Sequence, residues 1–512
     1  MTTKHRYITN TLMNIANTAF GFVIAYAMTP FILHRMGTES YGIWVFLGIF
    51  SISGYFSLLD FGFQGATIKY IAEFYTKNDR EQLERVVNAT VFFFFGVGII
   101  SAILLFGFNA LWLDSVFHIP AAQRSLVSAL VMILSASFLF QFPALALSAI
   151  VEGLQRYTYL RGVSMLATLL SKAVLLLFLR TDNGLPLVFG ATLAGSLVMT
   201  ILYAVIVRKL LPDIRIGIRR VQRSTLRLLL PLSSKLFASK VVGLVFNNTD
   251  KILIGIFLTV AFQTDYDIVN KSHIILLSIL SVFNQAALPA SSEFFAKKDT
   301  STLQVLLLRS TKYAAAAVMP AFIFLMIYPS NFLGAWVGRD FSHLGPLVQL
   351  YCVHIILTML VGVSSTMLVG INKVGQVLKI SLWAAVINLI ISVTTIHRFG
   401  LAGIIAGTSI AYLLSSAMYI IATNRIFQIR NAQFFHSTLL PIVPSMILTI
   451  AGLLAVRPFL HMTSILPWVV VVGITYLAFF VCLYWTGLSN EERRLTREIA
   501  SRFLHFSRTA HP

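Results

Sequence analysis

Polar and charged side chains recur at helical spacing inside long apolar runs of this 512-residue chain. Four runs carry such a stripe: Asn10, Asn14, Asn17 and Gly21; Ser53, Ser57, Asp60 and Gln64; Lys240, Asn247, Asp250 and Lys251; and Lys271, Ser278, Ser281 and Gln285. Each stripe follows the three-and-four spacing of one face of a helix. Because a polar group that faces lipid is costly, we expect these faces to line the interior of a helix bundle or a watery cavity.

The charged members of the stripes are mainly lysines, and this favours an anionic substrate that bears phosphate, carboxylates or both. It argues against an exporter of organic cations. The candidate substrate-binding residues are Lys172, Lys240, Lys271, Asn14, Asn17, Asn247 and Gln285, and the candidates for pairing with a lysine or binding a coupling cation are Asp60 and Asp250.

These polar residues also have purely structural interpretations. Serines and asparagines in membranes often join helices through hydrogen bonds of about 1 kcal/mol each. Lys235 can extend its ammonium group toward the inner interface, Asp60 can pair with a nearby basic group, and His354 fits a satisfied core position. Both kinds of interpretation stay open at the level of sequence.

The residue patterns of enzymes and metal sites do not occur. No loop between apolar runs is long enough for a nucleotide-binding domain, and neither GxxxxGK[ST] nor a Rossmann glycine pattern is found. The 11 histidines show no HExxH spacing, and Cys352 and Cys482 lie far apart. We therefore expect a protein that is not an enzyme, with no catalytic residue, no cofactor and no metal ion.

The elements that must position the polar residues are transmembrane helices. Hydrophobic residues make up 57% of the chain and charged residues 11%, with a mean hydropathy of +0.82, so the apolar surface exceeds what a water-soluble fold can bury. Runs of about 20 or more residues can cross about 30 Å of hydrocarbon. They predict an all-α polytopic membrane protein with about 14 helices at 8–33, 43–66, 86–110, 125–150, 158–180, 185–208, 228–258, 267–290, 310–333, 347–371, 376–398, 400–423, 438–458 and 464–487.

The distribution of basic residues sets the orientation and accounts for the net charge of +20. With the N-terminus inside, 28 of the 39 lysines and arginines fall in inner segments and 7 in outer segments, and the rest lie within the runs. Cytoplasmic loops of membrane proteins are enriched in this way. We expect both termini in the cytoplasm and no nucleic-acid partner.

A weak internal repeat divides the chain. Gly153, Gln155 and Arg156 match Gly370, Asn372 and Lys373, while Gly184, Leu185, Thr192 and Tyr203 match Gly400, Leu401, Thr408 and Tyr419 at an offset of 216. Such a repeat predicts two pseudo-symmetric six-helix lobes around a central cavity. The predicted parts are an N-terminal lobe (1–208), a basic cytoplasmic linker (209–227), a C-terminal lobe (228–424), two additional transmembrane helices (425–487) and a basic cytoplasmic tail (488–512).

Several short motifs resemble those of a known family. They are Gly37, Tyr41, Gly42, Ile43 and Trp44, then Leu59, Asp60, Phe61 and Gly62, then Tyr70, Ile71, Ala72 and Glu73, and in the second half Asp250, Tyr266, Asp267, Ile268 and Pro289. The chain is similar at these positions to the Wzx-type oligosaccharide flippases, which are polysaccharide-biosynthesis proteins of the multidrug/oligosaccharidyl-lipid/polysaccharide exporter superfamily. The resemblance covers most of the chain.

The resemblance implies a flippase that works by alternating access of two lobes. Its cargo would be an undecaprenyl-diphosphate-linked oligosaccharide, a surface-polysaccharide or O-antigen repeat unit, moved from the inner to the outer leaflet of the bacterial inner membrane. The implied partners are this lipid-linked oligosaccharide, membrane lipids, a coupling proton or sodium ion, and a polysaccharide polymerase and chain-length regulator. Related flippases for the peptidoglycan precursor need cations in helices 1, 2 and 8; Lys271 fits the helix 8 role, whereas the first helix offers asparagines in its body.

Two other functions stay open. A cation-coupled drug or organic-cation antiporter of the same superfamily should show a buried acidic cluster in one lobe, and Asp60 is the main residue that favours it. A non-transporting scaffold of a polysaccharide assembly complex is the other alternative, and the polar stripes argue against it.

Overall fold

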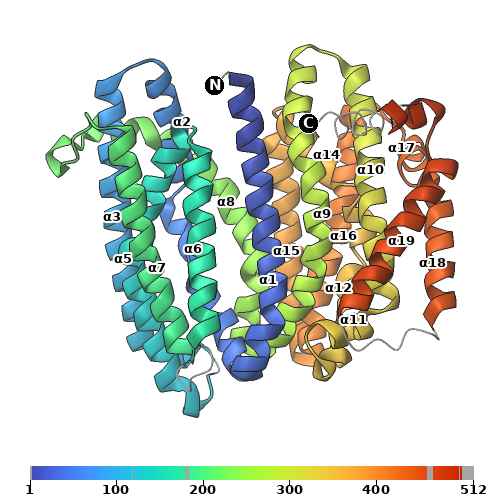
Figure 1. Cartoon of the computed structure of the whole chain (residues 1–512), viewed down its shortest axis with the longest axis horizontal. Helices are drawn as coiled ribbons and strands as arrows, with labels where there is room; N and C mark the ends of the chain where they lie inside the picture. Colours follow the sequence, from blue (N-terminus) through green and yellow to red (C-terminus); the bar gives the residue numbers. More distant parts are fainter. Residues whose placement is uncertain are drawn as a thin grey trace, which may run out of the picture. The chain divides into compact units, whose positions relative to one another are not determined.

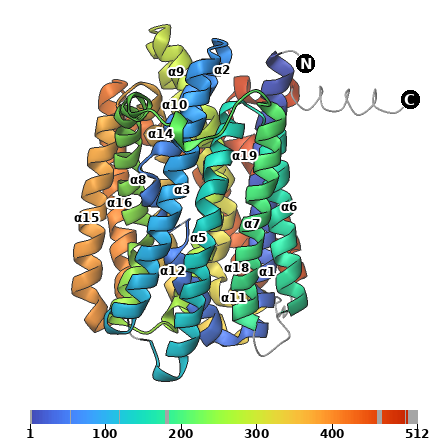
Figure 2. The same ribbon diagram turned by 90° about the vertical axis from the view of Figure 1, so that its left-hand side faces the viewer.

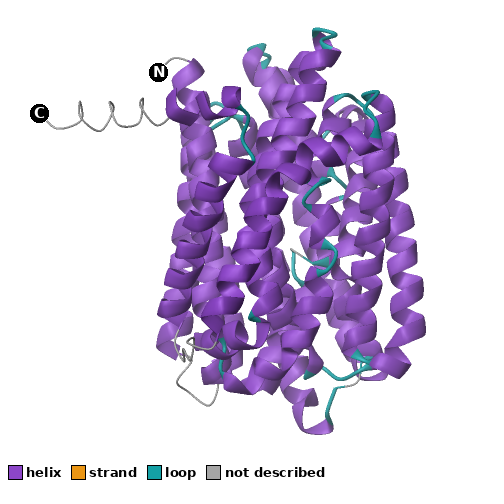
Figure 3. Cartoon of the chain, turned by 90° about the vertical axis from the view of Figure 1, so that its right-hand side faces the viewer, coloured by secondary structure: helices purple, strands orange, loops and turns teal. Residues whose placement is uncertain are grey.

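The computed structural model describes residues 3–498 except Ser53, His118, 179–183, 458–464 and Leu495, and these ranges contain helices and turns but no strand (Figure 3). The all-α polytopic membrane class predicted from the sequence is confirmed. By its internal contacts the chain divides into two compact units, unit 1 (Met1–Tyr266) and unit 2 (Asp267–Pro512), which are described separately.

Unit 1 consists of long helices joined by short turns (Figure 1). They are α1 Thr3–Leu47, α2 Phe63–Thr76, α3 Arg80–Leu111, α4 Leu113–Val116, α5 Arg124–Gly153, α6 Tyr157–Phe178, α7 Gly184–Leu210 and α8 Arg223–Phe257, with 3₁₀ helices at Gly48–Phe50, Tyr55–Asp60, Ala121–Gln123 and Ile218–Arg220. Helix α5 packs against α2, α3, α6 and α7, and Figure 2 shows α3, α5 and α7 side by side. Its buried face includes Leu134, Phe138 and Phe142, whereas α3 leaves Ile103 65% exposed, as expected for a face in contact with lipid.

Unit 2 begins inside α9, which spans Phe262–Ala296. Its other helices are α10 Thr300–Ile327, α11 Pro329–Trp336, α12 Gly345–Cys352, α13 Ile355–Thr358, α14 Gly362–Gly370, α15 Val374–Phe399, α16 Leu401–Ile426, α17 Asn431–Thr438, α18 Val443–Val456 and α19 Ile465–Thr486, with 3₁₀ helices at Arg339–Leu344 and Leu440–Ile442. The helix pair α15 and α16 packs along its length, and α16 also contacts α12, α13 and α14.

Eleven segments of the described chain are long and apolar enough to cross a membrane, against about 14 predicted helices. Parts of the first two predicted helices, 8–33 and 43–66, fall in one such segment, Ile24–Asp60. The prediction of a continuous helix over 347–371 is wrong, because this stretch is divided into α12, α13 and α14. Helix α8 is long enough at 35 residues but is not one of these eleven segments. Its charged residues include Lys235, Lys240, Asp250 and Lys251.

The two halves of the sequence use the same helix-ending motif. Asn78 after α2 and Lys298 after α9 have left-handed φ angles of 53° and 56°. The next residues, Asp79 and Asp299, each donate a backbone N–H to the carbonyl five residues earlier at 3.0 Å. Each aspartate side chain then accepts a backbone N–H of the following helix at 3.0 Å. This is a Schellman ending followed by an N-cap, and both devices are stabilising.

Two glycines matched by the repeat also have equivalent positions. A Cβ on Gly153 of α5 would come within 2.7 Å of an isoleucine of α2, and a Cβ on Gly370 of α14 would overlap a serine of α9. The turns that follow place Gln155 and Asn372 at φ angles of 56° and 62°. The repeat in the sequence therefore has a counterpart in local structure.

The basic segment between α7 and α8 is fixed on α3. The Asn88 side chain donates to the Arg215 carbonyl oxygen at 3.0 Å and accepts the Gly217 N–H at 2.7 Å. Helix α8 then packs along α2, so its contacts join it to unit 1, although the repeat assigns it to the lobe beginning at residue 228. The predicted domain limits stay predictions.

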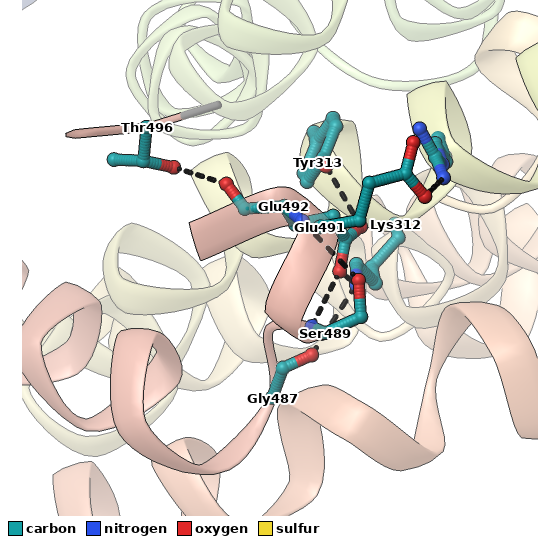
Figure 4. A network of polar contacts seen from close by, with 8 residues as sticks. Lys312, Tyr313, Gly487, Ser489, Glu491, Glu492 and Thr496 are labelled. Atoms are coloured by element: carbon teal, nitrogen blue, oxygen red, sulfur yellow. Dashed lines mark hydrogen bonds and ion pairs between the residues drawn. The ribbon is translucent and has the colours of Figure 1, made fainter. Parts of the chain in front are cut away.

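A buried ion pair holds the segment after α19 on α10 (Figure 4). Lys312 Nζ lies 2.7 Å from Glu492, with side chains 8% and 5% exposed. The Tyr313 hydroxyl and the Ser489 N–H also donate to this carboxylate, at 2.7 and 2.8 Å. Burial alone would raise the pKa of Glu492, but the hydrogen bonds from Lys312, Ser489 and Tyr313 outweigh burial and lower it to about 2.

Replacing Glu492 by glutamine is expected to release this segment, because Lys312 would stay buried without its counter-charge. A nitroxide label at Asn490→Cys, in a variant lacking the two native cysteines, should then report a more mobile segment. Since the folded-state pKa lies below the ordinary value of 4.5, the carboxylate stabilises docking above about pH 4.5 and loses this effect as the pH falls toward 2. Glu498→Gln, at an exposed carboxylate, is the control, and equal label mobility in both variants would contradict the role of Glu492.

Candidate functional site

The second predicted helix is not one helix. Helix α1 is kinked at Gly37 (φ 76°, ψ 166°) and its second part ends at Leu47. The 3₁₀ helix Tyr55–Asp60 comes next along this run after a shorter one at Gly48–Phe50, and Phe61 (φ 48°) and Gly62 (φ 73°) take left-handed angles before α2 begins. Left-handed residues cannot continue a right-handed helix. The prediction of one helical stripe is therefore wrong for this run: Ser57 and Asp60 lie on the 3₁₀ helix, Gln64 lies on α2, and Ser53 is outside the described residues.

Asp60, at the end of that 3₁₀ helix, forms an ion pair with Lys240 of α8. Lys240 Nζ lies 2.9 Å from Asp60 Oδ2 and donates to the Ser57 carbonyl oxygen at 2.7 Å. The second carboxylate oxygen, Asp60 Oδ1, accepts the Gly62 N–H at 2.9 Å. The sequence named Lys240 and Asp60 as separate candidates, and the structure brings them together within unit 1.

The two members of this pair differ in exposure. The Asp60 side chain is 3% exposed and the Lys240 side chain is 33% exposed. Lys240 lies midway along the 35-residue α8, about 25 Å from either end at 1.5 Å per residue. Where lipid surrounds such a helix, a charge this far from its ends is costly unless it is paired, and charged residues inside membrane helices mark functional sites by default. The accessible member of the pair is the cation.

A close approach of α2 and α8 at Gly62 brings the two charges into reach. A Cβ at Gly62 would overlap the Ser233 carbonyl oxygen and lie 2.8 Å from the Phe237 backbone nitrogen. With its φ of 73°, this position also suits glycine for conformational reasons. The contact is between backbones, so it fixes the distance between Asp60 and Lys240 firmly.

The pair can exchange partners. An ammonium group has three N–H donors, and the contacts of Lys240 with described residues use two of them, on Asp60 and on the Ser57 carbonyl oxygen. An oxyanion can accept the third donor and then compete with Asp60. If Lys240 turned to such an anion, Asp60 would keep its hydrogen bond from Gly62.

The other acidic candidate, Asp250, lies near the C-terminal end of α8 and is 2% exposed. Its Oδ2 accepts the Tyr266 hydroxyl at 2.9 Å. The adjacent Thr249 shares a 3.4 Å hydrogen bond with Tyr55 of the 3₁₀ helix that ends at Asp60. Helix α8 is therefore attached to this irregular segment at two levels, through Lys240 and through Thr249.

Comparison with known proteins identifies the family. Residues 32–346, more than half of the chain, match the family described as polysaccharide biosynthesis protein. The chain belongs to this family. The resemblance predicted from short motifs is thereby confirmed.

Two curated proteins are relatives of this polysaccharide biosynthesis protein. The uncharacterized membrane protein EpsK of Bacillus subtilis is 21% identical over 400 residues, which are 77% of this chain and 78% of EpsK. The probable low-salt glycan biosynthesis flippase Agl15 of Haloferax volcanii is 21% identical over 243 residues, which are 46% of this chain and 51% of Agl15.

Solved structures of two transport proteins are similar to it in fold, and one of them is named as a member of the MOP superfamily. The lipid II flippase MurJ in an inward closed conformation has a TM-score of 0.70 and 14% identity, with 93% of this chain and 99% of MurJ covered. An inward-facing multidrug resistance MATE family transporter of the MOP superfamily has a TM-score of 0.58 and 17% identity, with 82% of this chain and 94% of the transporter covered. At these identities the likeness concerns the fold.

Two further lysine candidates of the polysaccharide biosynthesis protein make contacts of their own. Lys172 of α6 has its Nζ 5.6 Å from the ring centre of Trp44 in α1, a cation–π contact. Lys271 of α9, in unit 2, pairs with Asp267 one turn earlier at 2.7 Å. The roles of these lysines stay predictions. The candidates whose side chains lie outside the described residues are Asn14, Asn17, Asn247 and Gln285.

Sequence reasoning missed two groups that shape the site. Ser57 acts through its backbone carbonyl oxygen, for which a side-chain pattern gives no signal. Gly62 was noted as part of a family motif, but not as the point where α2 and α8 meet. A glycine within an apolar run is a signal for a break or a close approach, and it could have located the interruption.

Proposed function

We propose that this protein moves an oligosaccharide linked to an isoprenoid diphosphate, such as undecaprenyl diphosphate, from the inner to the outer leaflet of the bacterial inner membrane by alternating access. The observation that carries the proposal is the Lys240–Asp60 pair, whose cation is partly exposed midway along the 35-residue helix α8. Family membership supports a role in polysaccharide synthesis. One relative is named as a glycan biosynthesis flippase and one protein of the same fold as a lipid II flippase.

Lys240 suits a diphosphate for electrostatic reasons. Lysine is a common point-charge ligand for phosphate. A phosphoryl oxygen can accept a hydrogen bond from the third N–H of the Lys240 ammonium group, because Asp60 and the Ser57 carbonyl oxygen use the other two. Binding then weakens the bond between Lys240 and Asp60 and loosens one attachment of α8 to the segment before α2. A change in ligand is thus linked to a change in how two helices are held together.

The orientation and partners follow from the same proposal. The excess of basic residues in the predicted inner segments supports cytoplasmic termini. A coupling cation would supply the driving force, since we expect no ATP hydrolysis within this chain. A polysaccharide polymerase and a chain-length regulator would act on the product at the outer leaflet.

The experiment uses proteoliposomes that hold the purified protein and a lipid-linked oligosaccharide. The fraction of glycan that an added glycosidase reaches is measured over time. We expect protein-dependent transfer between leaflets and its loss in the Lys240→Ala/Lys271→Ala variant. Transfer that continues unchanged in this variant would show that the lysine assignment is wrong.

The two alternative functions predict different results in the same vesicles. An antiporter would extrude a cationic dye under a proton or sodium gradient and would leave several lipid-linked oligosaccharides where they started. A scaffold would move neither the dye nor the lipid, although the protein reconstitutes in a folded form.

A further inference from the structure

Unit 2 contains two buried histidines that the proposed diphosphate site does not use. His273 of α9 is 2% exposed, and His354, between α12 and α13, is 0% exposed. Their ring centres lie 4.8 Å apart with the ring planes at 67°. Ionisable residues inside membrane-spanning segments are rare and often form proton or ion pathways.

Each histidine ring lies flat against a tyrosine ring. His273 stacks on Tyr351 at 4.3 Å with an angle of 15° between planes, and His354 stacks on Tyr412 at 4.2 Å with an angle of 8°. The face of a tyrosine ring attracts a cation. Each tyrosine face therefore attracts a positive charge on the imidazole that it covers and offsets part of the cost of burying that charge.

The hydrogen bonds leave lone pairs available. The Thr358 hydroxyl donates to the His354 carbonyl oxygen at 3.1 Å, so its oxygen accepts from His354 Nδ1 at 3.0 Å. In the neutral ring with hydrogen on Nδ1, Nε2 carries a lone pair. Neither His354 Nε2 nor either ring nitrogen of His273 has a hydrogen-bond partner among the described residues. Buried polar atoms without partners are uncommon and call for a specific explanation.

The helix that carries His354 is interrupted on both sides of α13. The Leu357 N–H donates a hydrogen bond to the His354 carbonyl oxygen at 3.1 Å, and the Leu360 N–H donates one to the Leu357 carbonyl oxygen at 3.0 Å. Each of these hydrogen bonds joins residues three apart. Such 3₁₀ geometry inside a helix often marks a hinge. Irregular backbone within a membrane protein commonly accompanies ion and substrate sites. His354 therefore lies where the backbone can rearrange.

The surroundings of the pair contain little other charge. Helices α12 and α13 have no charged residue, and Arg425, in the last turn, is the only one in α16. On α9 the charges before His273 are Asp265, Asp267 and Lys271, and the last two pair with each other at 2.7 Å. The titratable groups stacked on the two imidazoles in the described structure are Tyr351 and Tyr412, and the buried Cys352 comes two residues before His354 in the sequence.

We propose that His273 and His354 together form the coupling-ion site of this transporter and that the ion is one proton; this inference rests on the proposed flippase function. When the site opens to water, hydronium gives its proton to His354 Nε2 or to a ring nitrogen of His273. One N–H bond forms and one O–H bond of hydronium breaks. Return of the proton to water on the other side restores the neutral pair, and inward proton movement drives outward movement of the lipid-linked oligosaccharide.

The geometry limits the site to a single proton. Two imidazolium rings with centres 4.8 Å apart would repel each other strongly in a buried environment. The two histidines therefore titrate as a unit, and the second proton is excluded. A stoichiometry of one proton per transported molecule follows.

The first test measures protonation directly and needs no transport. Protein with ¹⁵N-labelled histidine is titrated in nanodiscs, with and without undecaprenyl diphosphate, and the ring nitrogen shifts are followed by nuclear magnetic resonance. We expect the pair to take up one proton as the pH is lowered, and bound undecaprenyl diphosphate to favour this uptake because its negative charge attracts the proton. His273→Gln or His354→Gln should remove this uptake, while His343→Gln, at an exposed position, should not. Two rings that stay neutral throughout, with and without the diphosphate, would overturn the proposal.

The second test measures coupling in proteoliposomes with the membrane potential clamped at zero. With one proton per cycle, a gradient of about one pH unit supports about a tenfold ratio of oligosaccharide between leaflets. We expect this ratio for the wild type and His343→Gln, and a ratio of about one for His273→Gln/His354→Gln, which still equilibrates the lipid. A tenfold ratio in the double variant overturns the coupling site but leaves the flippase function intact. If the wild type moves no lipid-linked oligosaccharide, the flippase function fails, and the first test still reports on the pair.

Discussion

Replacing Lys240 by methionine is expected to abolish flipping and to destabilise unit 1. Asp60, only 3% exposed, would lose its cation and keep the hydrogen bond from Gly62. Breaking a buried ion pair by removing one partner typically costs about 3–5 kcal/mol. If Lys240 contributes about 3 kcal/mol to binding the diphosphate, flipping falls about 100-fold or more. Glycosidase access in proteoliposomes measures the first effect, and the thermal unfolding temperature in detergent measures the second.

A charge exchange separates the structural effect from the functional one. In Asp60→Lys/Lys240→Asp the ion pair can form again, so most of the lost stability is expected to return. The partly exposed position would then be acidic and would repel a diphosphate, so flipping should stay low. Lys235→Met, at an exposed position of the same helix, is the matched control and should retain activity. Wild-type flipping in the exchanged variant would mean that the pair only holds α8 in place.

Composition and the spacing of apolar runs predicted the class of fold. A chain that crosses a lipid bilayer many times must be rich in apolar residues, and these must occur in runs of about the length of a membrane helix. They could not predict where a run is irregular, since apolar content is the same for an α-helix, a 3₁₀ helix and a kinked helix. Gly54 and Gly62 were signals within 43–66. The run 347–371 has two glycines, Gly362 and Gly370, but both lie in α14 and neither lies in the interruptions between α12, α13 and α14. The packing of α12 and α13 on α16 accompanies the change.

The sequence analysis named Lys240 and Asp60 as candidates but did not predict that they pair with each other. Lys240 and Asp60 were found because a charge inside an apolar run is unusual, which is a local property. Their contact depends on the approach of α2 to α8 at Gly62, which is a tertiary property. His354 was interpreted as a core residue, and it is fully buried with Nδ1 bonded to Thr358. His273 was not singled out, because stacking on Tyr351 leaves no periodic signal.

Replacing Gly62 by alanine is expected to separate α2 from α8 and to lower the unfolding temperature. A non-glycine residue at a left-handed φ of 73° is strained by about 1–3 kcal/mol, and its Cβ would also overlap the Ser233 carbonyl oxygen. Lys240 would then reach Asp60 less well, so flipping should fall as well. Gly96→Ala on α3, where no atom lies within 4 Å of the added methyl group, is the control. It should be neutral or stabilise by about 0.5–1 kcal/mol.

A second glycine on the same face distinguishes a backbone obstacle from a side-chain obstacle. A Cβ at Gly65 would lie 2.6 Å from Cδ1 of Leu236, the end of a flexible side chain. We therefore expect Leu236→Ala to restore most of the stability lost in Gly65→Ala. No side-chain change on α8 can remove the Ser233 carbonyl oxygen, so Leu236→Ala should rescue Gly62→Ala poorly. Equal rescue of both variants would mean that α2 and α8 can move apart freely, and the fixed distance between Asp60 and Lys240 would then lose its structural basis.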